Sequence, residues 1–207
     1  MNLIKIFLFS FFVILCSCGE RDFDSKPTEK MAGLTQVDSV DWKSYKNDTF
    51  GYSINYPSNW AVIEAHPRLD TYAVQARDIL ISDMGESELQ KVTFVEKSED
   101  KFWPGEFQIA VIKNSNGMTL SKWVQNIRIE DVSGGDLITE RENDTIAFRS
   151  SKRLKVFEFD GIETIYLLEH NNKFMALSFI SETPNDPHLI EHTSIYKNML
   201  LYLKLVE

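Results

Sequence analysis

The chain has 207 residues, 43% of them hydrophobic, a formal net charge of −9 and only two cysteines, Cys16 and Cys18. An acidic surface repels polyphosphates and anionic lipid headgroups, so this charge argues against nucleic acid as a partner and against electrostatic membrane docking. Because no cysteine follows Cys18, disulfides, thiolate metal sites and cysteine nucleophiles are excluded from the rest of the chain.

The first 17 residues have the pattern of a signal peptide. Lys5 precedes the run 6–15, in which nine of ten residues are apolar, and this run is too short to cross a bilayer as a helix. The residues at 15–19, LCSCG, resemble the bacterial lipobox. The resemblance implies cleavage after Ser17 and lipidation of the Cys18 thiol. An ordinary secretory signal or an uncleaved anchor is the alternative.

Residues 18–43 are predicted to be a flexible tether between the lipid and a domain at 44–207. The tether is rich in charged residues, Ser and Thr, so it has too few large apolar side chains to fold alone. Removal of residues 1–17 leaves 21 basic and 31 acidic residues, so acyl chains on Cys18 rather than charge would hold the protein on the membrane. Gly19 after the lipidated cysteine is compatible with sorting to the outer membrane, by resemblance to the sorting rule. The predicted location is the cell envelope, at the outer rather than the inner membrane.

The stretch 50–60, FGYSINYPSNW, predicts the opening strand of the domain. Large side chains alternate with small or polar ones, which is the period of a strand with one buried face. The four large side chains are those of Phe50, Tyr52, Ile54 and Tyr56. Pro57 is expected to end the strand, because proline has no amide hydrogen to give to a strand ladder.

Strands are also predicted at 60–64, 92–95 and 107–112. A short amphipathic helix is predicted at 67–83, with a strand at 79–81 as the alternative. The charged loop 96–106 carries Phe102 and Trp103, which we expect to contact a partner because aromatic side chains are frequent interface anchors. A core position for Trp103 is the alternative.

The second half of the domain alternates helical and strand patterns. Thr119 is the predicted N-cap of a helix that the glycine pair at 134–135 ends. Its apolar face consists of Leu120, Trp123, Val124 and Ile127. Three strands at 153–159, 162–169 and 174–181, with turns at 160–161 and 171–172, predict an antiparallel meander with 145–149 beside it.

A closing helix is predicted after Asp186, the expected N-cap, with Pro187 as its first residue. Its apolar face consists of Leu189, Tyr196, Met199, Leu200 and Leu203.

The opening stretch and this order of elements resemble the Mog1/PsbP-like superfamily (PsbP-like or DcrB-like), whose members often begin with an aromatic-Gly-aromatic strand that ends in Tyr-Pro. The matching residues are Phe50, Gly51, Tyr52, Ile54, Tyr56, Pro57 and Trp60. The resemblance covers about 44–206 and implies an α+β fold, an α/β/α sandwich with a central, mostly antiparallel sheet. No catalytic residue and no function come with it, because members bind very different things.

One motif has catalytic spacing, the sequence HLIEH at 188–192, which matches the His-x-x-Glu-His pattern of inverted zincins. Two histidines four residues apart share a helical face, and the glutamate could act as a base. That family takes its third ligand from an acid well downstream, whereas the terminal Glu207 is the sole acid after His192. A metal-dependent hydrolase using His188, Glu191 and His192 is therefore the alternative function. The structural interpretation places both histidines in solvent on the outer face of the helix.

The acidic cluster of Glu96, Glu99 and Asp100 is interpreted as a solvated loop, because it lacks the ligand order of a calcium loop. A weak calcium site is the alternative, and no other metal or cofactor is predicted. A strong anchoring signal without a catalytic constellation predicts a non-catalytic envelope lipoprotein that binds or assembles with another envelope protein. A passive lipoprotein that belongs to no complex is a further possibility.

Overall fold

The computed structural model describes residues 40–65, 88–97, 105–127, 129, 137–158, 161–183 and 188–206, all within the second of two compact units, Thr35–Glu207. The described elements are, in chain order, β1 (Trp42–Asn47), β2 (Tyr52–Pro57), β3 (Trp60–Ala65), β4 (Glu88–Glu96), β5 (Glu106–Lys113), α2 (Leu120–Asn126), β6 (Ile138–Ile146), β7 (Arg149–Glu158), β8 (Gly161–His170), β9 (Lys173–Glu182), α3 (Leu189–Leu201) and β10 (Lys204–Leu205). Neither described helix is long and apolar enough to cross a membrane. The predictions for Ser17, Cys18, 67–83, Phe102, Trp103 and the glycine pair at 134–135 lie outside the described residues.

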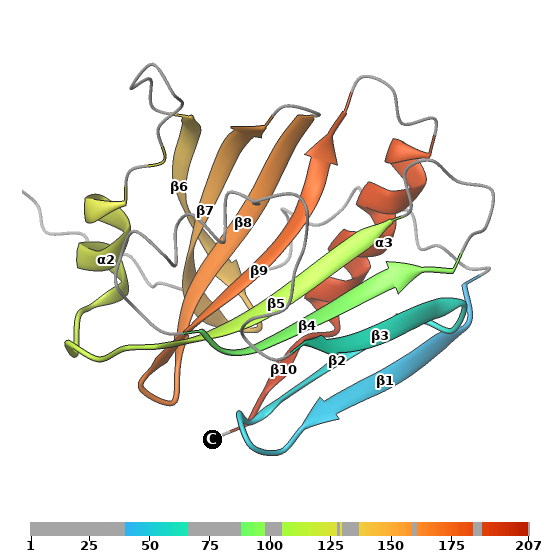
Figure 1. The fold of residues 1–207 in the computed structure, drawn as a ribbon, viewed down its shortest axis with the longest axis horizontal. Helices are drawn as coiled ribbons and strands as arrows, with labels where there is room; N and C mark the ends of the chain where they lie inside the picture. The colour runs from blue at the N-terminus through green and yellow to red at the C-terminus, as the bar shows by residue number, and fades with distance from the viewer. Residues whose placement is uncertain are drawn as a thin grey trace, which may run out of the picture. The chain divides into compact units, whose positions relative to one another are not determined.

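The described strands form two sheets, and all of their pairings are antiparallel (Figure 1). The smaller sheet has the order β1-β2-β10, and the larger one has the order β3-β4-β5-β9-β8-β7-β6. With two helices beside mostly antiparallel sheet, the chain has the α+β class that was predicted. A central, mostly antiparallel sheet is expected from the sequence, and the described strands form a larger sheet of seven strands with a smaller one of three beside it. Because β1 and β10 occupy both edges of β2, β3 cannot pair with β2 and opens a second sheet.

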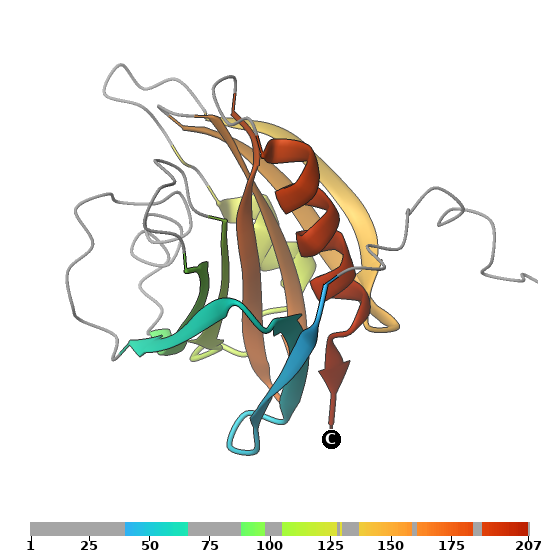
Figure 2. The same cartoon turned by 90° about the vertical axis from the view of Figure 1, so that its right-hand side faces the viewer.

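The middle strands of the larger sheet are buried on both faces. In β5, Ile109 and Val111 join the core that contains α3, whereas Ala110 and Ile112 join the core that contains α2. Successive side chains of a strand point to opposite faces, so one continuous apolar run supplies both cores. The helix α3 lies along one face of this sheet and contacts β2 and β9, while α2 contacts β7 and β8 (Figure 2).

The opening motif is buried as predicted, although β2 begins at Tyr52 rather than at Phe50. Tyr52 and Ile54 are buried in the α3-side core, and Phe50 and Tyr56 are half-buried against it. Phe50 lies in the turn between β1 and β2, where Gly51 has a φ of +70° that a residue with a Cβ rarely adopts. The motif therefore combines a buried strand with a turn that requires glycine.

The first strand of the domain, β1, was not predicted, and residues 42–43 were assigned to the tether. Its burial does not alternate: Trp42 and Tyr45 are half-buried and lie three residues apart, with two exposed residues between them. The strand forms because β2 offers it a complete antiparallel partner, with Tyr45 opposite Ile54. Long-range pairing of this kind leaves no periodic signal in the strand itself.

The predicted helix after Thr119 is confirmed as α2, but it ends at Asn126, before the glycine pair, with Ile127 as an extended C-cap. The Thr119 hydroxyl oxygen accepts a hydrogen bond from the Lys122 amide at 3.3 Å, and the four residues of the predicted apolar face are buried. The closing helix is confirmed as α3, but it begins at Leu189 rather than at Pro187. His188 is its N-cap, because that residue has φ −101° and ψ 6°, outside the helical region.

The predicted meander is confirmed as β7, β8 and β9. Asn171 and Asn172 form the β8–β9 turn with φ values of 50° and 57°, as expected for a two-residue hairpin turn. The strand predicted beside the meander is confirmed as β6, but the bounds 145–149 are wrong, because β6 ends at Ile146 and Ala147 and Phe148 form the turn into β7. Local sequence does not mark this turn, since neither residue favours a positive φ.

Candidate functional site

A buried ion pair in the α3-side layer lies between the end of β4 and the first turn of α3. The His192 Nε2 atom lies 3.1 Å from the Glu96 Oε2 atom, and the two side chains are 3% and 11% exposed. A buried carboxylate needs partners for its charge. Here the histidine and the Gly105 amide, which donates to the same oxygen at 3.4 Å, supply them.

The ion pair closes the base of the segment 98–104. The Glu96 amide donates to the Gly105 carbonyl oxygen at 2.9 Å, and the Glu106 amide donates to the Tyr196 hydroxyl oxygen at 2.9 Å. A Cβ added at Gly105 would lie 2.8 Å from the Trp60 ring and 2.9 Å from the His192 ring. Only glycine fits between these two rigid rings. The described residues on either side of the predicted contact residues, Glu96 and Gly105, are therefore held together beside α3.

The structure separates the members of the His-x-x-Glu-His motif. The side chains of His188 and Glu191 are 41% and 59% exposed, with the His188 Nδ1 atom 3.8 Å from the Glu191 Oε2 atom, whereas His192 is buried. The prediction that both histidines lie in solvent is wrong for His192. The prediction that Glu96 belongs to a solvated acidic loop is also wrong, while Glu99 and Asp100 lie outside the described residues. Across the described ranges, no cluster of three His, Cys, Asp or Glu side chains could hold a metal ion.

Two periodic patterns could have placed this ion pair from the sequence. His192 lies four residues before Tyr196 and seven before Met199, both on the buried face of α3. Glu96 continues the alternation of Val92 and Phe94, which are fully buried in the same core. The His-x-x-Glu-His motif indicates the spacing of His188 and His192, but it does not indicate which of them lies on the buried face of α3.

We expect the ion pair to show as a coupling energy of about 1.5 kcal/mol, because a hydrogen bond to a charged group in a buried site contributes about that much. The measurement is a double-mutant cycle with Glu96→Gln and His192→Phe, using denaturant unfolding. The exposed pair of His188 and Glu191 is the matched control, with an expected coupling below about 0.5 kcal/mol. Equal coupling in the two cycles would contradict a structural role for Glu96 and His192.

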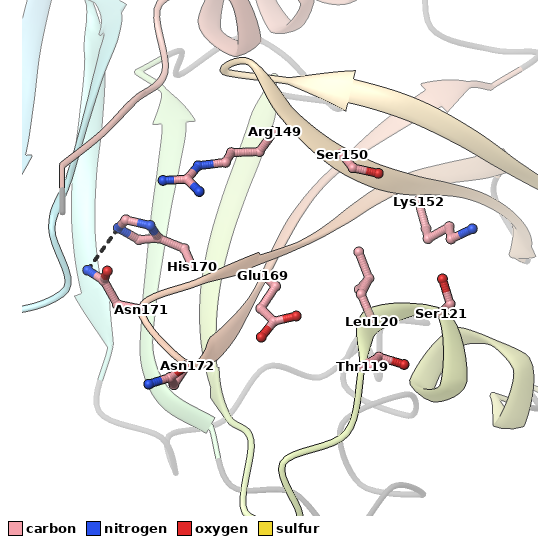
Figure 3. A pocket seen from close by; sticks show the side chains of 10 residues that line it. All are labelled: Thr119, Leu120, Ser121, Arg149, Ser150, Lys152, Glu169, His170, Asn171 and Asn172. Atoms are coloured by element: carbon pink, nitrogen blue, oxygen red, sulfur yellow. Dashed lines mark hydrogen bonds between the residues drawn. The ribbon is translucent and has the colours of Figure 1, made fainter.

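A polar groove of about 640 Å³ lies at the other end of the larger sheet, where the β8–β9 turn meets the start of α2 (Figure 3). Its lining consists of Thr119, Leu120, Ser121, Arg149, Ser150, Lys152, Glu169, His170, Asn171 and Asn172. Figure 3 shows the Arg149 side chain extending toward His170. The His170 Nε2 atom lies 2.9 Å from the Gly51 carbonyl oxygen and 3.1 Å from the Asn171 side-chain nitrogen, so His170 joins the β8–β9 turn to the turn before β2.

The fold and the sites define an α+β domain of mostly antiparallel sheet with a buried glutamate–histidine pair. No family model matches the sequence. No curated protein matches it either.

The solved structures that are similar to this fold include the following two. A crystal structure from Bacteroides thetaiotaomicron VPI-5482 matches at 13% identity and a TM-score of 0.45, over 80% of this chain and 48% of that one. The chain thus spans about half the length of the Bacteroides structure. The solution structure of cyanobacterial PsbP from Synechocystis sp. PCC 6803 matches at 13% identity and a TM-score of 0.47, over 86% of this chain and 99% of that one.

Proposed function

We propose that the chain is a cell-envelope lipoprotein whose domain is a non-catalytic protein-binding or assembly module. In this proposal the peptide is cleaved after Ser17, acyl chains on Cys18 hold the protein on the outer membrane, and the acidic domain binds an envelope protein rather than nucleic acid. The α/β/α sandwich belongs to the same proposal, supported by the separate cores around α2 and α3.

The observation that carries the proposal is the closed base of the segment 98–104. The Glu96 carboxylate lies 3.1 Å from the His192 ring nitrogen and also accepts from the Gly105 amide, and the Gly105 backbone packs against the His192 ring. These contacts support a structural role for the three residues instead of a catalytic one. In this proposal Phe102 and Trp103 contact the partner, and the contact between Glu96 and Gly105 on either side of them supports it by lowering the entropic cost of binding. The hydrolase alternative has one supporting feature, the motif itself, and His192 is committed to Glu96.

The test is capture of a partner by the full-length protein purified from the envelope in detergent. Its intact mass is measured first, because an unmodified Cys18 would contradict the anchor. We expect the double variant Phe102→Ala with Trp103→Ala to lower the yield of a captured envelope protein about tenfold or more, since aromatic anchors carry most of the binding energy at interfaces. Phe157→Ala is the control, because Phe157 is 54% exposed on β7.

Two results would overturn the proposed function. One is capture of no protein, or of the same proteins in equal yield by the wild type and by the Phe102 and Trp103 variant. The other is stoichiometric zinc in the purified protein by elemental analysis, with its loss in a His192→Ala variant, which would restore the hydrolase.

A further inference from the structure

The turn between β6 and β7 holds a fully exposed phenylalanine in an unfavourable backbone conformation. Phe148 is 100% exposed and has a φ of 61°, and the preceding Ala147 has a φ of 49°. Hairpin turns with two positive φ angles strongly favour Asn and Gly, because a Cβ with a bulky substituent is strained there. The β8–β9 turn of this chain uses Asn171 and Asn172 for the same geometry. Folding therefore gives no reason for phenylalanine at 148.

The hairpin beneath Phe148 is rigidly held. Ile146 is buried in the α3-side core, and Ala147 packs against that core. Further along the hairpin, the Arg153 guanidinium forms ion pairs with Glu142 and Asp144 across the two strands. The aromatic ring at the tip thus stands on a fixed support, which is how strained residues persist at contact sites.

Basic and polar side chains follow Phe148 directly. Arg149, Ser150 and Lys152 line one side of the polar groove, and Glu169 is the one carboxylate among its described lining residues (Figure 3). The Lys152 Nζ atom also donates to the Asn143 Oδ1 atom. Two cations at this position contrast with the formal net charge of −9 of the whole chain. The groove lining that begins at Arg149, the residue after Phe148, therefore has a charge that is complementary to acidic side chains.

From these observations we propose that Phe148 and the groove beside it form one contact surface for a partner protein, which inserts Phe148 into an apolar pocket and places acidic side chains against Arg149 and Lys152. This proposal rests on the protein-binding function above and names a contact point that is separate from Phe102 and Trp103. A lipid surface fits less well, because one aromatic side chain gives little membrane affinity and the acidic domain is repelled by anionic headgroups.

The experiment places the photoreactive residue p-benzoylphenylalanine at position 148 of the full-length lipidated protein, with position 157 as the control, and irradiates the native envelope. We expect a crosslinked protein from 148 and none from 157, with the crosslink mapped by mass spectrometry to an apolar segment flanked by acidic residues. Arg149→Glu combined with Lys152→Glu should lower the crosslink yield about tenfold. Lys122→Glu, on the exposed side of α2, should leave it unchanged.

A second variant separates binding from folding. Phe148→Asn should lower the yield of captured partner about tenfold while raising the melting temperature by about 2–4 °C, because asparagine tolerates the positive φ. A structural role for Phe148 would instead lower the melting temperature, and that result overturns the proposal.

Further outcomes separate the inference from the proposed function. If Phe148→Asn retains the partner that the Phe102 and Trp103 variant loses, the inference fails and the proposed function stands. If neither variant loses a partner, both fail. A crosslink from 148 to a second copy of this chain overturns the inference. So does flotation with phosphatidylethanolamine and phosphatidylglycerol vesicles that depends on Phe148, because it assigns the ring to lipid.

Discussion

Replacing Trp123 by alanine should lower the free energy of unfolding by about 3–5 kcal/mol, the range expected when a buried tryptophan is truncated. Trp123 is 0% exposed and stacks on Phe174 with ring centroids 4.2 Å apart and planes 9° apart. The helix α2 has only seven residues and would not be stable alone, so its packing through this ring holds it on the sheet. The measurement is guanidinium unfolding followed by circular dichroism, with the denaturant slope compared between variants.

Trp123→Phe is the matched control for this variant. It keeps a ring against Phe174 and removes the Nε1 donor, which is buried and finds no acceptor among the described residues. The loss of packing lowers the free energy of unfolding, whereas the removal of an unsatisfied donor raises it. We therefore expect the free energy of unfolding to change by no more than about 1.5 kcal/mol. A loss below about 1 kcal/mol for Trp123→Ala would contradict the placement of α2 in the cooperative core.

The second large effect is expected for Gly51→Ala, which should lower the free energy of unfolding by about 3 kcal/mol. A φ of +70° alone disfavours alanine by about 1–2 kcal/mol. In addition, the new Cβ would lie 2.5 Å from the Val206 carbonyl oxygen, a backbone atom that cannot move without the chain. The Gly51 carbonyl oxygen also accepts a hydrogen bond from the Val206 amide at 2.8 Å and lies 2.9 Å from the His170 Nε2 atom, so the strain reaches the C-terminal strand.

Gly117→Ala separates the backbone strain from the steric clash. Gly117 has a φ of +58°, and a Cβ there would meet nothing within 4 Å, so we expect a loss of about 1 kcal/mol. Amide hydrogen exchange at Val206 should accelerate in the Gly51 variant and stay unchanged in the Gly117 variant. Equal stability losses in the two variants would show that the contact with Val206 is not tight.

The positions of Glu96 and His192 explain why the candidate site was not predicted from the sequence. Each residue follows the buried pattern of its own element, β4 or α3, but the two are 96 positions apart in the chain. Periodicity indicates which face of an element is inside, whereas it does not indicate which element covers that face. The motif at 188–192 suggested a metal because its histidines are close in sequence, and folding turned one outward and the other toward Glu96.

Local pattern was enough to predict the buried face of α2, the antiparallel meander with its Asn171–Asn172 turn and the burial of Tyr52 and Ile54. In each case the signal lies within about ten residues, as side-chain period or turn chemistry. Only tertiary packing decided that β1 exists, that the strands divide into two sheets, that Glu96 pairs with His192 and that Phe148 is exposed on a strained turn. These features depend on contacts between segments that are distant in the sequence. Because the free energy of such a contact depends on both segments, the sequence of one segment does not predict it.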